Sequence, residues 1–161
     1  MKLYQEQFKQ GYIRGWGCLV TSMINGVNQA INAGLIYDDI DLISELALIE
    51  RAGWNDNYPV MSDGENLDEK GSYVWDHEKL MNIILKVAGR DDKRAFYKAR
   101  VDFPRDNEIR VPKKPSIIIG QFDTKWGSHF KLLFPNEIDP AENGLETLGL
   151  MSLRFYNIID V

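Results

Sequence analysis

The sequence predicts one domain of the α+β class, with helices in the first half of the chain and an antiparallel sheet in the second. Apolar residues recur at helical spacing up to about residue 88, and short runs rich in β-branched and aromatic residues follow from about residue 95. Several of these runs are joined by short connections, which favours antiparallel pairing. Helices followed by strands are typical of an α+β domain, and 161 residues suit a single one spanning 1–161.

The first predicted helix begins at or beside Cys18. The residues after it place apolar side chains on one face at intervals of three and four positions, as far as Gly34. The members of this face are Leu19, Met23, Val27, Ala30 and Ile31.

Two more helices are expected before the sheet. The second runs from about Ile40 to Ala52, and Gly53 fits a C-terminal stop. The third runs from about His77 to Ala88, and Gly89 closes it. Aspartates at both helix starts can accept hydrogen bonds from the first N–H groups: a cluster of Asp38, Asp39 and Asp41 offers N-caps for the second, and Asp76 caps the third.

Four strands are expected in the second half. Their sequences are AFYKARVDF, SIIIGQF, SHFKLLF and LMSLRFYNIIDV, separated by Pro, Gly, Asn and Asp. The stretch 54–73 between the second and third helices is polar and turn-rich, which indicates a solvated loop or a lid. Its carboxylates do not reproduce the spacing of a calcium loop, and we expect no metal and no cofactor. These carboxylates are Asp56, Asp63, Glu65, Asp68 and Glu69.

Composition narrows the classes of partner. With 19 Lys and Arg against 24 Asp and Glu, the formal net charge is −5, which argues against a nucleic-acid partner. A single cysteine cannot form an internal disulfide. The first residues lack the apolar core of a signal peptide, and no run of 18 apolar residues occurs, so we expect a cytoplasmic protein without membrane association. The oligomeric state stays open.

Cys18 is the first candidate for chemistry. At a helix N-terminus a thiol lies beside unpaired N–H groups and the positive end of the helix dipole, which favour the thiolate and can receive an oxyanion. The alternative is that Cys18 is a small buried residue of the core.

Two histidines could serve Cys18 as a base. His77 falls in the first turn of the third helix, where the dipole disfavours an imidazolium, and we expect it on the surface. His129 starts a strand and can lean from the sheet edge over a helix N-terminus, as nucleophilic thiol catalysis requires.

Three stretches resemble the papain-like cysteine peptidases, in particular the branch similar to bacteriocin-processing (double-glycine leader) peptidases. They are GWGCLVTSMINGVNQ, GSHFKLLF and IDPAENG, in the order found in that family. The resemblance implies a papain-like fold and a catalytic triad of Cys18, His129 and Asp139. Because Asp139 can fall in a turn, three further residues could orient the imidazole instead, namely Asn136, Glu137 and Asn143.

The same resemblance implies a glutamine that helps to bind the oxyanion, shortly before the cysteine. The commonest position is occupied by Tyr12, so we select Gln10, with Gln7 and Gln5 as alternatives. Four residues flank the nucleophile and the base and could form the walls of a substrate cleft: Trp16, Gly17, Trp126 and Gly127. The tryptophans could equally pack in the core, and the glycines could serve turns.

The resemblance implies a hydrolase, a thiol protease or amidase that cleaves or transfers an amide bond. Its substrate would be a peptide, a leader sequence or a peptidoglycan cross-link. Two other classes are open: a catalytically inactive binding module of the same fold, such as an accessory protein of a phage or mobile element, and a structural or assembly protein in which Cys18 only packs.

Overall fold

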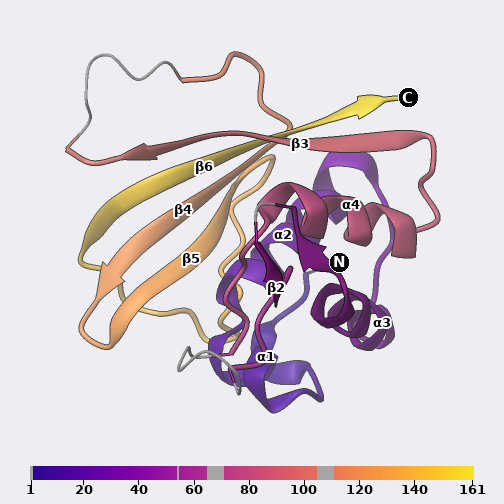
Figure 1. Ribbon diagram of the computed structural model, residues 1–161. Helices are drawn as coiled ribbons and strands as arrows, with labels where there is room; N and C mark the ends of the chain where they lie inside the picture. Colours follow the sequence, from indigo (N-terminus) through magenta and orange to yellow (C-terminus); the bar gives the residue numbers. More distant parts are fainter. Residues whose placement is uncertain (1, 54, 65–70, 105–110) are drawn as a thin grey trace.

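The computed structural model describes residues 2–53, 55–64, 71–104 and 111–161. It confirms the mixed α+β class, since helices gather on one side and a four-stranded sheet lies on the other (Figure 1). The order of the strands across the sheet is β3-β6-β4-β5, and every neighbouring pair is antiparallel. The strands are β3 (Lys93–Asp102), β4 (Ile117–Thr124), β5 (Gly127–Phe134) and β6 (Gly149–Asp160).

The three predicted helices are present, and two shorter elements precede them. The main helices are α2 (Cys18–Ile31), α3 (Tyr37–Ile49) and α4 (His77–Val87), and the shorter elements are η1 (Gln5–Gln7) and α1 (Gly11–Trp16). The expected start of α4 is confirmed, because Asp76 Oδ1 accepts a hydrogen bond from the Lys79 N–H at 3.0 Å. Its expected stop is confirmed too, because Gly89 has a φ of +68°.

The predicted limits of α3 were wrong. The helix begins at Tyr37 rather than near Ile40, so Asp38 and Asp39 lie in its first turn instead of before it. Asp39 Oδ2 accepts a hydrogen bond from the Ile36 N–H at 2.8 Å, which fastens this start. The helix also ends earlier than expected, since the residues after it form a short strand.

A small two-stranded sheet lies where the sequence predicted the end of the second helix and the start of the loop 54–73. β1 (Arg51–Ala52) pairs antiparallel with β2 (Asn55–Pro59). Residues 65–70 lie outside the described residues, and with them Glu65, Asp68 and Glu69 of the predicted acidic loop.

The helices cover one face of the large sheet. α2 packs on β4 and β5, α4 packs on β3, and α3 packs against α4. α2 approaches the sheet closely at Gly26, where a Cβ would lie 2.8 Å from Ile117 Cγ2. Between the layers lies an apolar core whose fully buried side chains include Met23, Ile24, Leu80, Ile84, Ile119 and Leu132. In the described ranges no helix combines the length and the apolar character needed to cross a membrane.

Candidate active site

Cys18 is positioned by the junction of two helices. The Gly17 N–H closes α1 by donating to Ile13 O at 2.8 Å, and α2 begins at the next residue. A Cβ at residue 17 would lie 2.4 Å from the same carbonyl oxygen, so the junction needs a glycine. No side chain among the described residues caps α2. The first N–H groups of α2 therefore lie beside the Cys18 side chain without a side-chain acceptor.

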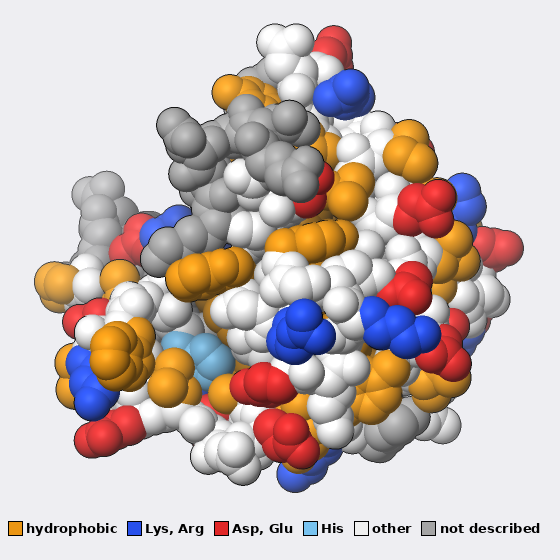
Figure 2. Space-filling model, turned by 90° about the horizontal axis from the view of Figure 1, so that it is seen from below, with side chains coloured by type: hydrophobic (Ala, Val, Ile, Leu, Met, Phe, Trp, Pro, Cys, Tyr) orange, Lys and Arg blue, Asp and Glu red, His pale blue; other side chains and the backbone are white. Residues whose placement is uncertain are grey.

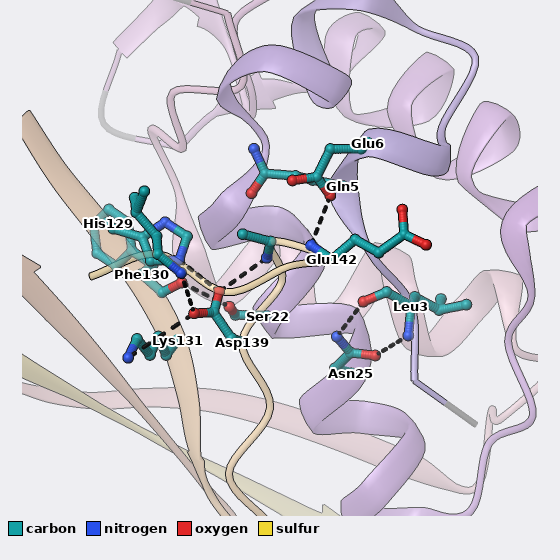
Figure 3. A network of polar contacts seen from close by, with 12 residues as sticks. Leu3, Gln5, Glu6, Ser22, Asn25, His129, Phe130, Lys131, Asp139 and Glu142 are labelled. Carbon is teal, nitrogen blue, oxygen red and sulfur yellow. Dashed lines mark hydrogen bonds and ion pairs between the residues drawn. The ribbon is translucent and has the colours of Figure 1, made fainter. Parts of the chain in front are cut away.

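The N-terminal segment around Leu3 and Gln5 is held by α2 on one side and by the chain near Pro140 on the other. Asn25 of α2 bonds to the Leu3 backbone twice, accepting from its N–H and donating to its carbonyl, both at 2.9 Å (Figure 3). The Gln5 N–H donates to Pro140 O at 2.8 Å. These bonds fix Gln5 between α2 and the chain that follows β5.

That chain brings Asp139 to His129. After β5 it turns back along the strand, and Leu132 and Ile138 exchange both backbone hydrogen bonds, at 3.1 and 3.0 Å. The next residue, Asp139, reaches the imidazole, and its Oδ1 lies 2.7 Å from His129 Nε2 (Figure 3). Since Nε2 is engaged with Asp139, Nδ1 is the ring nitrogen left to face Cys18.

Further donors fasten the Asp139 carboxylate. Oδ1 also accepts from the Ala141 N–H at 2.9 Å, and Oδ2 accepts from the Leu145 N–H at 3.1 Å. Lys131 Nζ lies 3.9 Å from Oδ2. Burial alone would raise the pKa of Asp139, but the hydrogen bond from His129 and the two backbone N–H groups lower it below its ordinary value. Asp139 is therefore a carboxylate at neutral pH, with a fixed orientation.

His129 is nearly buried, at 4% exposure. Burial by itself would lower its pKa, but side-chain hydrogen bonds with Asp139 and Cys18, together with the charges of these groups, raise the pKa to about 9. The ring is consequently an imidazolium at neutral pH, placed between a carboxylate and the sulfur-bearing side chain.

Cys18 and His129 line one cavity of about 960 Å³. Trp16, Trp126 and Gly127 also line it, as predicted for walls of a cleft, and their exposure of 49% and 74% excludes core packing of the two tryptophans. Gly127 has a φ of +122°, which favours glycine in the turn between β4 and β5. Figure 2 shows the face that carries α1 and this turn, and a histidine is visible there in a hollow between hydrophobic side chains.

The structure does not bring every predicted residue to this cavity. The Gln10 amide donates to Asp41, and Gln7 accepts from the Tyr37 hydroxyl, so both are engaged elsewhere. Gln5 does line the cavity; its Nε2 donates to Arg14 O at 3.3 Å, and its Oε1 is buried without a partner among the described residues. Gly17 is not among the lining residues, and its missing side chain serves the helix junction.

The alternatives to Asp139 lie in different places. Asn136 donates to Gln29 Oε1 at 2.7 Å, and Glu137 is exposed and outside the cavity. Asn143 is exposed and lines the cavity. Of the four candidates, only Asp139 has a hydrogen bond with His129 in the structure.

The prediction that His77 is a surface residue was wrong. Its ring stacks on Tyr97 with the centroids 4.5 Å apart, and its Nδ1 lies 2.7 Å from the Tyr156 hydroxyl oxygen. Burial, with the positive charges of Arg154 and Arg100, lowers the pKa of His77 to about 3. The reason is that α4 packs over β3, which places the ring against Tyr97 of β3 and within reach of Tyr156 of the neighbouring strand β6. His77 is thus a neutral imidazole that lines the same cavity.

Sequence reasoning also missed Arg154. It lies on β6, lines the cavity and is only 5% exposed. One signal was available: in LMSLRFYNIIDV, Arg154 shares its strand face with Ser152 and Tyr156, and an arginine is unusual on a face that turns towards a core.

Comparison with protein-family models, curated proteins and solved structures gave no match for this chain.

Proposed function

We propose that the chain is a cysteine hydrolase with a papain-like arrangement, cleaving or transferring a peptide or amide bond through Cys18, His129 and Asp139. One observation carries the proposal: the side chain at the uncapped start of α2 interacts with an imidazole whose other ring nitrogen is bonded to a carboxylate. An imidazolium beside the sulfur favours the thiolate, which is the nucleophilic form of cysteine. A substrate can reach both groups, since they line the same cavity.

The proposed reaction has two steps. The Cys18 thiolate attacks the carbonyl carbon, and the imidazolium of His129 gives its Nδ1 proton to the departing amine as the carbon–nitrogen bond breaks. A water then attacks the thioester while His129 takes a proton from it, which releases the acid and regenerates the thiolate and imidazolium. Asp139 keeps the ring oriented throughout by accepting from Nε2.

The oxyanion of each tetrahedral intermediate would be bound by the Cys18 N–H and the Gln5 side-chain amide. Gln5 takes the role first assigned to Gln10, because Gln5 lines the cavity and is held there through its backbone bond to Pro140. Preorganised donors of this kind lower the barrier by about 3 kcal/mol each. To act, the Gln5 amide must turn its N–H from Arg14 O towards the oxyanion.

The second candidate is a binding module of the same architecture that does not turn over its ligand. The observation in its favour is that the Gln5 amide donates to Arg14 O, so in this state its N–H is not available to an oxyanion at Cys18. A tetrahedral intermediate would then lack one of its two donors.

The test is product formation from a mixture of defined peptides, leader-type peptides and peptidoglycan fragments, followed by mass spectrometry. The proposal predicts new amine and acid termini with the wild type and none with Cys18→Ala or His129→Ala. Products with equal yield from Cys18→Ala would contradict it. Retention of unmodified peptides by both wild type and Cys18→Ala, without any product, would favour the binding module.

A further inference from the structure

Arg154 carries a buried charge without a counterion among the residues that the structure describes. Its Nη1 donates to Ser152 Oγ at 2.7 Å and to Gln121 Oε1 at 3.1 Å. Its Nε is buried and has no hydrogen-bond partner among the described residues, and no described carboxylate lies within ion-pair distance of the guanidinium. A buried arginine is ordinarily paired with an acid, because an isolated buried charge is costly.

In the described part of the chain, the groups around Arg154 do not form an ion pair with it. Its ring neighbours are neutral: Phe130 lies under the guanidinium at 4.8 Å, and Tyr97 interacts with it through a side-chain hydrogen bond. His77 is also neutral, with a pKa lowered to about 3 by burial and then by the nearby cations. Arg100 adds a second cation and is paired with Asp102 at 2.8 Å, and the Asp102 charge acts on Arg154 only from beyond ion-pair distance.

The cavity that holds Cys18 and His129 extends to this cation. His129 lies on β5, and Arg154 lies on β6, with β4 between them. Neighbouring strands are about 4.8 Å apart, so the strands of the two residues are separated by about 10 Å. Along β4 the two positions differ by three residues, because His129 pairs with Phe122 and Arg154 pairs with Ile119, and this adds an offset of about 10 Å. The two positions are therefore about 14 Å apart, the length of about four extended residues. Gln121 of β4 lines the cavity between the two positions.

The acidic side chains of the cavity lie elsewhere. Glu142 follows the Asp139 turn, and its backbone N–H donates to Glu6 Oε2 at 3.0 Å, beyond the edge of β5 (Figure 3). Among the described lining residues, the charges are therefore polarised across the sheet, with the carboxylates of Glu6 and Glu142 outside β5 and the guanidiniums of Arg154 and Arg100 over β6 and β3.

We propose that Arg154 binds a carboxylate of the substrate, so that the enzyme selects peptides with an acidic group about four residues from the cleaved bond. This inference rests on the proposed function for the position of the cleaved bond, but the binding of the carboxylate does not require catalysis. Arg154 lines the cavity and has no ion-pair partner among the described residues, so a carboxylate that enters this end of the cavity can accept charge-assisted hydrogen bonds from its guanidinium. The carboxylate can come from an acidic side chain or from a free C-terminus.

Two isomeric probes separate these sources, namely N-acetylglutamine, whose only carboxylate is the α-carboxylate, and N-acetylisoglutamine, whose only carboxylate is on the side chain. N-acetylglutaminamide, which has neither, is the neutral control. Binding to the Cys18→Ala protein is followed through the ring NMR signals of His77, which adjoins Arg154 but takes no part in hydrolysis. Because the nucleophile is absent, the result is independent of whether the protein is a hydrolase.

At least one of the two acids should bind at least about tenfold more tightly than the diamide, as expected of a charge-assisted hydrogen bond. The acid that binds more tightly identifies the source of the carboxylate, which is a C-terminus for N-acetylglutamine and a side chain for N-acetylisoglutamine. Replacing the arginine in Arg154→Met should remove the preference, whereas Arg94→Met, the same change at an exposed position of β3, should leave it intact. Equal binding of both acids and the diamide would overturn the inference, and this comparison needs no arginine variant. A preference that survives in folded Arg154→Met would overturn it as well.

Discussion

Asp139→Asn changes one charge at the centre of the site and keeps the size of the side chain. The pKa of His129 is about 9 against an ordinary 6.5, and this difference corresponds to about 3 kcal/mol in favour of the imidazolium. Burial opposes this rise in the pKa. The hydrogen bonds and charges of Asp139 and Cys18 must therefore offset the cost of burial and also raise the pKa above its ordinary value. Without the Asp139 charge, we expect the pKa of His129 to fall by at least about 2 units.

The consequence for Cys18 is largest near neutral pH. At about pH 7.5, a pKa of about 9 leaves about 97% of His129 protonated, whereas a pKa near 6.5 leaves about 10%. If reactivity follows the ion pair, carbamidomethylation of Cys18 at this pH should slow about tenfold in the variant. NMR titration of the His129 ring measures the first effect, and mass spectrometry of the labelled peptide measures the second.

The pH dependence of the unfolding free energy gives an independent test of the raised pKa of His129. Because the pKa of His129 is raised on folding, its stabilising contribution is fully present below about pH 6.5 and is lost as the pH rises through about 9. The difference in unfolding free energy between wild type and Asp139→Asn should therefore shrink as the pH rises from about 6.5 to about 9, and stay small above that. Glu137→Gln, an equal charge change at a nearby exposed residue, is the control and should change neither titration nor labelling. A His129 pKa that stays within about half a unit in Asp139→Asn would refute the reasoning.

Three further predictions follow from the same geometry. Gln5→Ala should lower turnover about 100-fold and leave the rate of Cys18 carbamidomethylation unchanged. Gln10→Ala should change neither the turnover nor the labelling rate. A loss of turnover in Gln10→Ala but not in Gln5→Ala would assign the oxyanion role to Gln10. Because the pKa of His77 is depressed, its contribution to stability is present above about pH 6.5 and lost as the pH falls towards about 3. The unfolding free energy of the wild type should therefore fall with decreasing pH in this range, and His77→Phe should make this fall less steep by up to about 1.4 kcal/mol per pH unit. Urea unfolding at several pH values measures the difference. Arg154→Met should keep the unfolding free energy or raise it by up to about 2 kcal/mol, because it removes a buried charge that no described carboxylate pairs with. Its two polar partners, Ser152 and Gln121, still bond to each other at 2.9 Å. A loss of more than about 2 kcal/mol would show that the arginine stabilises the fold.

Local patterns predicted the elements well where the deciding contacts are close in sequence. The start of α2 at Cys18 and the Asp76 cap of α4 follow from residues within one helical turn. The strand of His129 follows from a short alternating run. Asp139 was placed near His129 by the family resemblance, and the structure brings the two together because the chain turns back along β5.

The incorrect predictions depend on contacts between distant parts of the chain. The burial of His77 is decided by Tyr156, which is 79 residues away in sequence. Gln5 reaches the cavity because Asn25 and Pro140 hold the N-terminal segment, and because α1 is inserted between it and Cys18. Spacing along the sequence carries no information about such an insertion, so it favoured Gln10.

The rate at which iodoacetamide modifies Cys18 at about pH 6, relative to the same thiol in the unfolded chain, tests the central claim most directly. A thiolate held beside the His129 imidazolium should react at least about tenfold faster than the unfolded thiol, and His129→Phe should abolish the advantage. Equal rates for the folded wild type and the unfolded chain, with Cys18 accessible to the reagent, would contradict the account.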